Sequence, residues 1–180
     1  MIYTLHGEDA FSLSAEEKRL TTDLVSAQWR SVNLTVFDGQ TARISEVINA
    51  ARTPSFFGDR LVVVRDCPWF APGARKKKDD PEAEANHVPD SGSSKVLVDL
   101  LKEGLPAGCN LLLVAPKAIN KTLSTSKALL EGAAAKPPRV LLREFPGPDP
   151  YKPERTVSWL VGYARDTAQG IDQNAAQLLV

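Results

Sequence analysis

The chain passes from an amphipathic helix into a buried strand through Arg52-Thr53-Pro54-Ser55-Phe56-Phe57-Gly58-Asp59-Arg60-Leu61-Val62-Val63-Val64-Arg65. The helix is indicated by apolar residues at helical spacing just before this segment, at Ile44, Val47, Ile48 and Ala51. Pro54 ends it, because proline lacks the amide hydrogen that a helix needs. Leu61 to Val64 are all apolar, which is typical of a parallel strand buried on both faces. The segment is therefore one helix-to-strand unit of an α/β fold.

Four further strands are predicted from short apolar runs bounded by turn residues, at residues 2–6, 32–37, 110–115 and 139–145. Helical patterns separate these runs. The first helix is expected to begin at Ser14, because Ser14-Ala15-Glu16-Glu17 has the sequence of a capping box. Strands that alternate with helices form a parallel sheet covered on both sides. We therefore expect a five-stranded parallel sheet with helices on both faces, spanning residues 1–145.

Two segments depart from this alternation. Residues 71–94 combine a basic run, acidic residues, proline, glycine and serine without apolar periodicity, and we expect a solvated insertion there. Residues 146–153 contain four prolines and are expected to form a stiff hinge between domains. Residues 154–180 are then expected to begin a small helical domain. Two short helices cannot bury their own apolar faces, so we expect this domain to be truncated.

The composition is that of a soluble globular protein in a reducing compartment. Of the 180 residues, 43% are hydrophobic, and 22 basic residues balance 22 acidic ones. This balance argues against a strongly basic nucleic-acid binder, so any DNA contact is expected to be local. Cys67 and Cys109 stand far apart and suggest neither a disulfide nor a metal site, and no apolar run approaches membrane-spanning length. We expect a cytoplasmic protein without membrane contact.

Phe56 and Phe57 lie at the corner between helix and strand, and adjacent residues rarely share one direction of burial. Pro54 before them and Gly58 after them favour a stiff, tight projection that presents at least one ring to solvent. Exposed aromatic side chains insert into pockets of other proteins. The alternative, in which both rings belong to the core, stays open at this point because buried phenylalanine is common.

The first turn stands where a nucleotide-binding domain carries a phosphate loop of pattern G-x-x-x-x-G-K-[ST]. Gly7 and Ser14 fit this pattern, but Ser12 replaces the second glycine and Leu13 replaces the lysine. Two acidic residues inside the turn add repulsion, and a single acid, Asp66, follows the third strand where a magnesium site needs an acidic pair. We expect a chain that does not hydrolyse ATP, with no catalytic residue, no cofactor and no metal.

The remaining polar candidates carry weaker hypotheses. His6 and His87 form no constellation with cysteine and acid, and are interpreted as strand-end and surface residues. Three aspartates would form a metal cluster if they met at the strand ends, but turn residues that accept backbone hydrogen bonds are favoured; they are Asp9, Asp38 and Asp66. For the run Lys76 to Lys78 a solvated surface is favoured over nucleic-acid contact. Candidate phosphate or DNA contacts after the fourth strand are Lys117, Lys121 and Lys127.

Several segments in a fixed order resemble a known family. They are Tyr3-Thr4-Leu5-His6-Gly7-Glu8-Asp9-Ala10-Phe11, Val36-Phe37-Asp38-Gly39, the segment 52–65, Leu111-Leu112-Leu113-Val114 and Trp159-Leu160. Together they resemble the N-terminal region of the delta subunit of bacterial DNA polymerase III, and the resemblance spans almost the whole chain. It implies a clamp-loader subunit with an AAA+ type fold that has lost nucleotide binding, followed by the start of a lid domain.

The resemblance also implies partners and a mechanism. The family binds the sliding clamp, the beta subunit of the polymerase, by inserting two adjacent apolar residues that correspond to Phe56 and Phe57. A surface that fits the opened clamp better than the closed one shifts the opening equilibrium without chemistry. ATP is then bound by motor subunits of the same assembly, which acts on primed DNA. The turn is shaped by Thr53, Pro54, Ser55 and Gly58, and Arg52 and Arg60 are rim contacts.

Two departures from the family pattern stand out. The insertion at 71–94 is longer than the family leads us to expect. The family also continues through complete lid and collar domains that join it to the other loader subunits, whereas this chain stops within the lid. We expect clamp contact, but not loader assembly, from these residues alone. The alternative function is a small nucleotide-dependent α/β enzyme with an unorthodox phosphate loop.

Overall fold

The computed structural model describes residues 1–71, 91–147, 153–166 and 170–179. The chain divides into two compact units, Met1–Phe145 and Pro146–Val180. The predicted insertion lies mostly outside the described residues, together with Lys76 to Lys78 and His87, and so does the centre of the predicted hinge. Residues 91–94, which we assigned to the insertion, belong to a helix instead.

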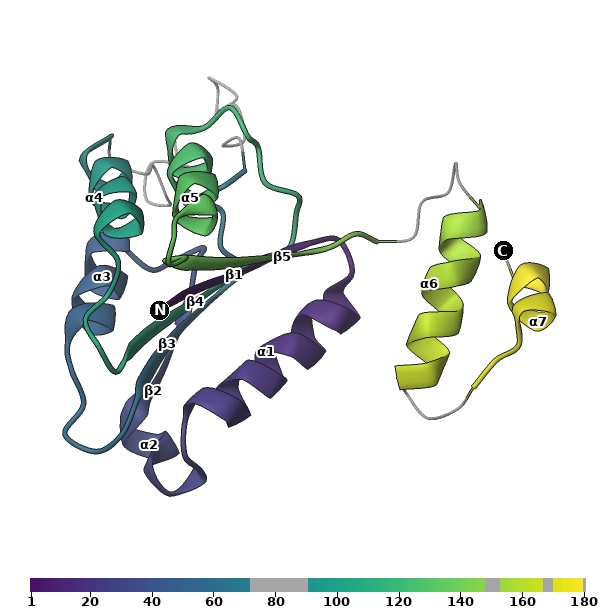
Figure 1. The fold of residues 1–180 in the computed structure, drawn as a ribbon, viewed down its shortest axis with the longest axis horizontal. Helices are drawn as coiled ribbons and strands as arrows, with labels where there is room; N and C mark the ends of the chain where they lie inside the picture. The colour runs from purple at the N-terminus through teal and green to yellow at the C-terminus, as the bar shows by residue number, and fades with distance from the viewer. Residues whose placement is uncertain (72–90, 148–152, 167–169, 180) are drawn as a thin grey trace, which may run out of the picture. The chain divides into compact units, whose positions relative to one another are not determined.

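The first unit is built on a five-stranded parallel sheet, as predicted (Figure 1). The strands lie in the order β2-β3-β4-β1-β5, and every neighbouring pair is parallel. Their bounds are β1 Ile2–Gly7, β2 Leu34–Asp38, β3 Arg60–Arg65, β4 Cys109–Ala115 and β5 Val140–Phe145. The second strand begins later than predicted, because residues 32 and 33 form the end of a short helix. β4, at the centre of the sheet, is buried along its whole length.

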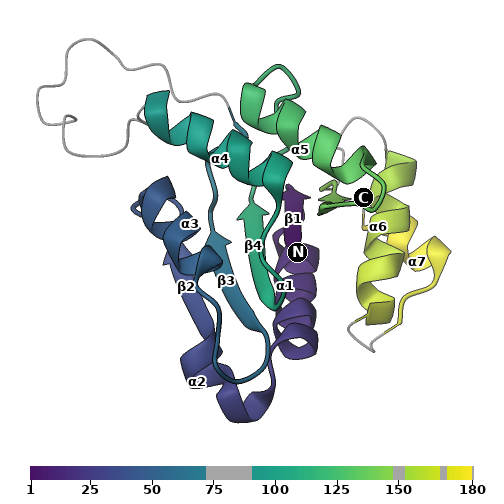
Figure 2. The ribbon, with the colours of Figure 1, turned by 60° about the vertical axis from the view of Figure 1, so that its left-hand side comes forward.

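Helices cover both faces of the sheet, which confirms the predicted layers. Helix α1 (Ala10–Leu24) lies on one face, whereas α3 (Ile44–Arg52), α4 (Ser91–Glu103) and α5 (Ser124–Ala134) lie on the other (Figures 1 and 2). Two short elements, η1 (Ala27–Trp29) and α2 (Arg30–Asn33), connect α1 to β2. The face under three helices therefore carries the larger core.

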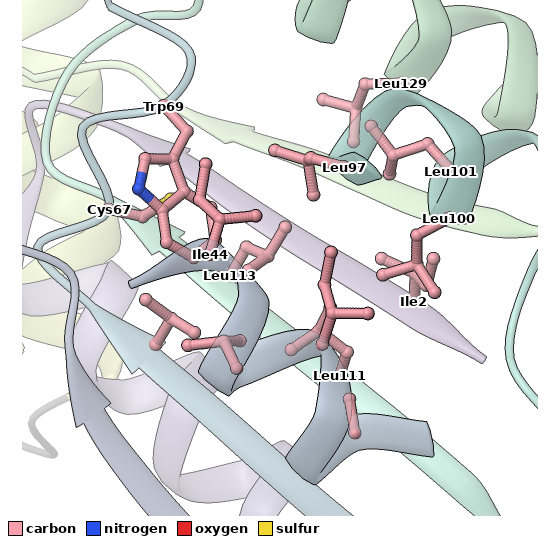
Figure 3. Packing of buried hydrophobic residues seen from close by; sticks show 14 of the residues in the cluster. Ile2, Ile44, Cys67, Trp69, Leu97, Leu100, Leu101, Leu111, Leu113 and Leu129 are labelled. Carbon is pink, nitrogen blue, oxygen red and sulfur yellow. The ribbon is translucent and has the colours of Figure 1, made fainter. Parts of the chain in front are cut away.

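The two cores follow from the alternation of side chains along the strands. Leu61 and Val63 pack toward α1, while Val62 and Val64 pack toward α3, α4 and α5. The larger cluster joins strand residues such as Ile2, Leu111 and Leu113 to the leucines of α4 and to Leu129 of α5 (Figure 3). A side chain of this kind contributes about 1.5–3 kcal/mol when it leaves water. Continuous apolar strands are thus explained by burial on both faces.

The first helix begins at Ala10, so the predicted start at Ser14 is wrong. Asp9 is the N-cap: its carboxylate accepts a hydrogen bond from the backbone amide of Ser12 at 3.0 Å. The acid of the supposed capping box, Glu17, pairs instead with Arg65 of β3 at 2.7 Å. Glu16 similarly contacts Arg143 of β5 at 2.5 Å. The two glutamates therefore attach α1 to strands on either side of it.

The second unit contains α6 (Pro153–Asp166) and α7 (Gln173–Leu178). Asp172 caps α7, as the sequence predicted, by accepting hydrogen bonds from the amides of Asn174 and Ala175 at 2.8 and 2.9 Å. Val157, Ala164 and Ala176 are its buried apolar side chains among the described residues. In the parts of the chain that the structure describes, no helix has the length and apolarity needed to cross a membrane.

Candidate functional site

The aromatic pair lies in the connection from α3 to β3, at the edge of the sheet where the strands begin. Phe56 is 97% exposed and Phe57 is 55% exposed. The prediction that at least one ring faces solvent is confirmed, and the alternative that both rings are core residues is wrong. One ring of the pair contacts another aromatic side chain: Phe57 stacks on Trp29, with ring centroids 4.5 Å apart and planes inclined by 10°.

Hydrogen bonds hold the turn that carries the two rings. The Ser55 hydroxyl donates to Oδ1 of Asn33 at 2.6 Å and accepts from the backbone amide of Phe57 at 3.1 Å. The side-chain amide of Asn33 donates to the carbonyl oxygen of Phe57. Gly58 follows with φ of 72°, in the left-handed region that glycine adopts without strain. The turn is thus fixed on both sides of the exposed rings.

The residues predicted to flank the two rings lie in or next to the turn, and, besides Ser55, three of them have polar contacts within the chain. The hydroxyl of Thr53 donates to the carbonyl oxygen of Asn49 at 2.8 Å in the last turn of α3, and Pro54 is exposed. Arg52 pairs with Glu103 of α4 at 3.0 Å. The guanidinium of Arg60 donates to the hydroxyl of Thr35 on β2 at 3.3 Å. Their contact with a partner stays a prediction.

The turn from β1 to α1 lacks the positive charge of a phosphate loop. Gly7 has φ of 140°, and a Cβ placed there would lie 1.9 Å from the carbonyl oxygen of Phe145. Asp9 occupies the N-terminus of α1, where a bound phosphate would accept hydrogen bonds from backbone amides. Leu13, in place of the phosphate-binding lysine, is buried under the sheet, and Ser14 is exposed. The negative charge of Asp9 and the lack of a lysine at position 13 oppose triphosphate binding.

The other polar candidates at the carboxyl ends of the strands do not form one site. Asp38 accepts a hydrogen bond from the amide of Gln40 at 2.8 Å, which is the turn role we favoured. No group of three or more histidine, cysteine, aspartate or glutamate side chains is placed to hold a metal within the described ranges. His6 is buried, and burial lowers its pKa; Glu144 opposes that shift and Lys121 adds to it. The three predicted DNA contacts, Lys117, Lys121 and Lys127, are exposed.

The model of the family described as DNA polymerase III, delta subunit, matches residues 3–136. The chain belongs to this family. A curated delta-family protein, the DNA polymerase III subunit delta of Bacillus subtilis (strain 168), is 30% identical over 77 residues, which are 43% of this chain and 22% of that protein. The solved structure of the Bacillus subtilis DNA clamp loader delta protein is similar in fold, with a TM-score of 0.71 at 22% identity.

That fold similarity covers 99% of this chain but 47% of the delta-family chain of known structure. The chain therefore spans less than half the length of the delta-family relatives to which it is similar. The family model establishes membership in the DNA polymerase III delta subunit family. It leaves the contacts of the individual residues to be argued from their geometry.

Two residues of the candidate site, Trp29 and Asn33, were not predicted from the sequence. Both come from the segment between α1 and β2, which we did not assign to the site. The available signal was a tryptophan in an otherwise polar segment just before a strand. This tryptophan can be assigned to the site only when β2 and β3 are known to be neighbours, because the segments that lead into the two strands then lie side by side.

Proposed function

We propose that this chain binds a bacterial sliding clamp through the turn that carries Phe56 and Phe57, and acts as a clamp-opening subunit in DNA replication. The observation that carries this proposal is the exposure of Phe56, 97%, on a turn whose backbone is fixed by hydrogen bonds. An aromatic ring that a fold leaves in water gains about 1.5–3 kcal/mol when a pocket of another protein covers it. Membership in the delta family supports the proposal that the protein with that pocket is the sliding clamp.

Clamp opening requires no chemistry in this chain. A ligand shifts a conformational equilibrium only by the difference between its affinities for the two states. We propose that the surface around Phe56 fits the opened clamp better than the closed one. Each tenfold difference in affinity corresponds to about 1.4 kcal/mol of opening free energy.

The non-catalytic role is supported by the turn between β1 and α1, where Asp9 occupies the anion position and Leu13 is buried. We therefore propose that other loader subunits bind the ATP and that they also join this chain to primed DNA. The exposed Lys117, Lys121 and Lys127 are proposed DNA contacts in that assembly. The proposed organisation is an AAA+-like domain at 1–145, a hinge at 146–153 and the beginning of a lid at 154–180, in a cytoplasmic complex.

Co-elution of the full chain with a bacterial sliding clamp in size-exclusion chromatography is the first test, followed by surface plasmon resonance to obtain Kd. We expect a complex with the wild-type chain. Phe56→Ala should weaken it at least tenfold without lowering the Tm, because this ring contacts almost nothing within the chain. The double variant that also carries Phe57→Ala should abolish binding.

The matched control is Phe11→Ala, which truncates another partly exposed phenylalanine at the opposite edge of the sheet, near the start of α1. It should leave Kd unchanged. Absence of binding by the wild-type chain to clamps from several bacteria would overturn the proposed function. Equal losses in Phe11→Ala and Phe56→Ala would show that the turn is not the contact surface.

A further inference from the structure

We propose that Arg30 and Arg60 bind acidic side chains of the clamp, beside the pocket that takes the two rings of the turn. The binding surface then combines an apolar contact, made by Phe56 and Phe57, with charge pairs at its border. This inference rests on the proposed function, because it extends the same site and names the chemistry of the partner surface.

Arg30 and Arg60 lack the carboxylate partner that other arginines of the first unit have. Four arginines of this unit each pair with an acidic side chain of the chain itself; they are Arg19, Arg52, Arg65 and Arg143. Within the described residues Arg30 and Arg60 form no ion pair, although both are partly buried. The Nε of each is enclosed by the protein and has no hydrogen-bond partner in the described part of the chain. Each guanidinium has therefore lost hydration that no acid of the described chain replaces.

Both arginines lie beside the aromatic turn. Arg60 is the first residue of β3 and ends the connection that carries the two rings, whereas Arg30 begins α2 and follows Trp29, on which one of those rings stacks. The carbonyl oxygen of Arg30 accepts a hydrogen bond from the backbone amide of Leu34, which is paired with Leu61 of β3. Both residues are thus at the amino ends of β2 and β3, where α2 and the connection from α3 to β3 lie side by side (Figures 1 and 2).

Two acidic side chains at the same edge of the sheet face other groups. Asp59 precedes Arg60, but its carboxylate faces the segment before β4, where its Oδ1 lies 3.5 Å from the position of a Cβ on Gly108. Glu103 pairs with Arg52 at the end of α3. The surface around the rings therefore keeps unpaired positive charge, and a complementary partner surface is acidic.

Binding itself makes an acidic partner necessary. Insertion of the two rings brings the surface of the clamp over Arg30 and Arg60 and removes more of their water. A guanidinium left unpaired in such an interface opposes binding, whereas a carboxylate placed against it accepts charge-assisted hydrogen bonds. Arg60 has donors available for these bonds, because among the described residues it donates only to the hydroxyl of Thr35, at 3.3 Å. The clamp therefore carries acidic side chains next to its apolar pocket.

Surface plasmon resonance with the full chain and the clamp tests the two charges separately. Arg30→Gln and Arg60→Gln should each weaken binding by about tenfold, chiefly by raising the dissociation rate, and should make Kd depend less on salt. Arg60→Glu, which reverses the charge, should weaken binding more than Arg60→Gln. The matched control is Arg43→Gln, because Arg43 is exposed, forms no ion pair within the described residues and directly precedes α3 at the opposite edge of the sheet. It removes the same charge and should leave Kd unchanged.

A search for the acidic partner completes the experiment. Acidic residues on the clamp surface are changed one by one to their amides, and the carboxylate that pairs with Arg60 is the one whose loss weakens binding of the wild-type chain but not of Arg60→Gln. Thermal melts verify folding, and Arg30→Gln decides alone if loss of the bond to Thr35 unfolds Arg60→Gln.

Three results would overturn the inference. They are an unchanged Kd and salt dependence in both Arg30→Gln and Arg60→Gln, an equal loss in Arg43→Gln, which would show only a general attraction of charges, and a scan that finds no coupled carboxylate. Failure of the wild-type chain to bind would instead overturn the proposed function.

Discussion

The carboxylate of Asp9 accepts two hydrogen bonds from Ser12, one from the backbone amide at 3.0 Å and one from the hydroxyl at 2.5 Å. The N-terminus of a helix carries a partial positive charge, and its first amides lack partners within the helix. In α1 this position is occupied by an anion of the chain itself. A phosphate group would have to displace Asp9 and would meet its negative charge.

Replacement of Asp9 by Ala should therefore lower stability without creating a nucleotide site. We expect a loss of about 1 kcal/mol in urea denaturation, which is typical for the loss of an N-cap, and a much smaller loss in Asp9→Asn, which retains a capping oxygen. Equilibrium dialysis with ATP and Mg²⁺ should detect no saturable binding in the wild type or in either variant, because Leu13 supplies no cation. Micromolar binding by the wild-type chain would contradict this interpretation and favour the alternative of a nucleotide-dependent enzyme.

Gly7 should not tolerate a side chain. A Cβ at this position would lie 1.9 Å from the backbone oxygen of Phe145, and the φ of 140° is unfavourable for other residues. Gly7→Ala should lose at least about 4 kcal/mol or fail to fold. Gly58→Ala is the matched comparison: its φ is also positive, but a Cβ would meet nothing within 4 Å. We expect only about 1–2 kcal/mol there, from the left-handed conformation. Similar losses in both variants would refute the steric argument.

Glu16 should contribute to stability only above the acid range. The hydrogen bond from Arg19, with the nearby charge of Arg143, lowers the pKa of Glu16 in the folded state below the ordinary value near 4.5. The unfolded chain therefore binds more protons below pH 4.5, so this contribution is complete above that pH and is lost as the pH falls through the lowered pKa. Denaturation of wild type and Glu16→Gln between pH 3 and 7 measures it. The two curves should converge at low pH and differ by no more than about 1 kcal/mol at pH 7.

The two cysteines should be unreactive until the chain unfolds. Cys67 and Cys109 are both buried, and burial raises the pKa of the Cys67 thiol to about 12. Because the thiolate is the reactive form, a disulfide reagent such as DTNB at pH 8 should label the native protein slowly. Addition of guanidinium chloride should expose both thiols in one transition. Rapid labelling of one thiol in the native state would indicate local opening near that residue.

The sheet was predictable because the central strands are recognisable from their own residues, which form continuous apolar runs. Leu61 to Val64 are apolar at every position, and the structure buries all four because helices cover both faces. The start of α1 was not predictable in the same way. Ser14 and Glu17 have the spacing of a capping box, but Asp9 caps the helix five residues earlier, and Glu17 pairs instead with Arg65 of β3. A tertiary contact replaced the local one.

The candidate site was predictable in position but not in detail. Pro54 and Gly58 locate a turn, and the turn does expose Phe56. The difference in exposure between Phe56 and Phe57 depends on Trp29 and Asn33, which are distant in sequence and become neighbours only through the order of β2 and β3.

The parallel sheet also separates two surfaces of the first unit. The turn with Phe56 precedes β3, whereas Lys117 follows β4, so the two lie at opposite ends of strands that are five to seven residues long. At about 3.3 Å per residue this spacing is about 20 Å. The strands therefore hold Lys117 away from the turn with Phe56. A dye or a surface linker attached through Lys117→Cys would not contact a protein bound at that turn. Single-molecule tethering of this unit can be designed around that distance.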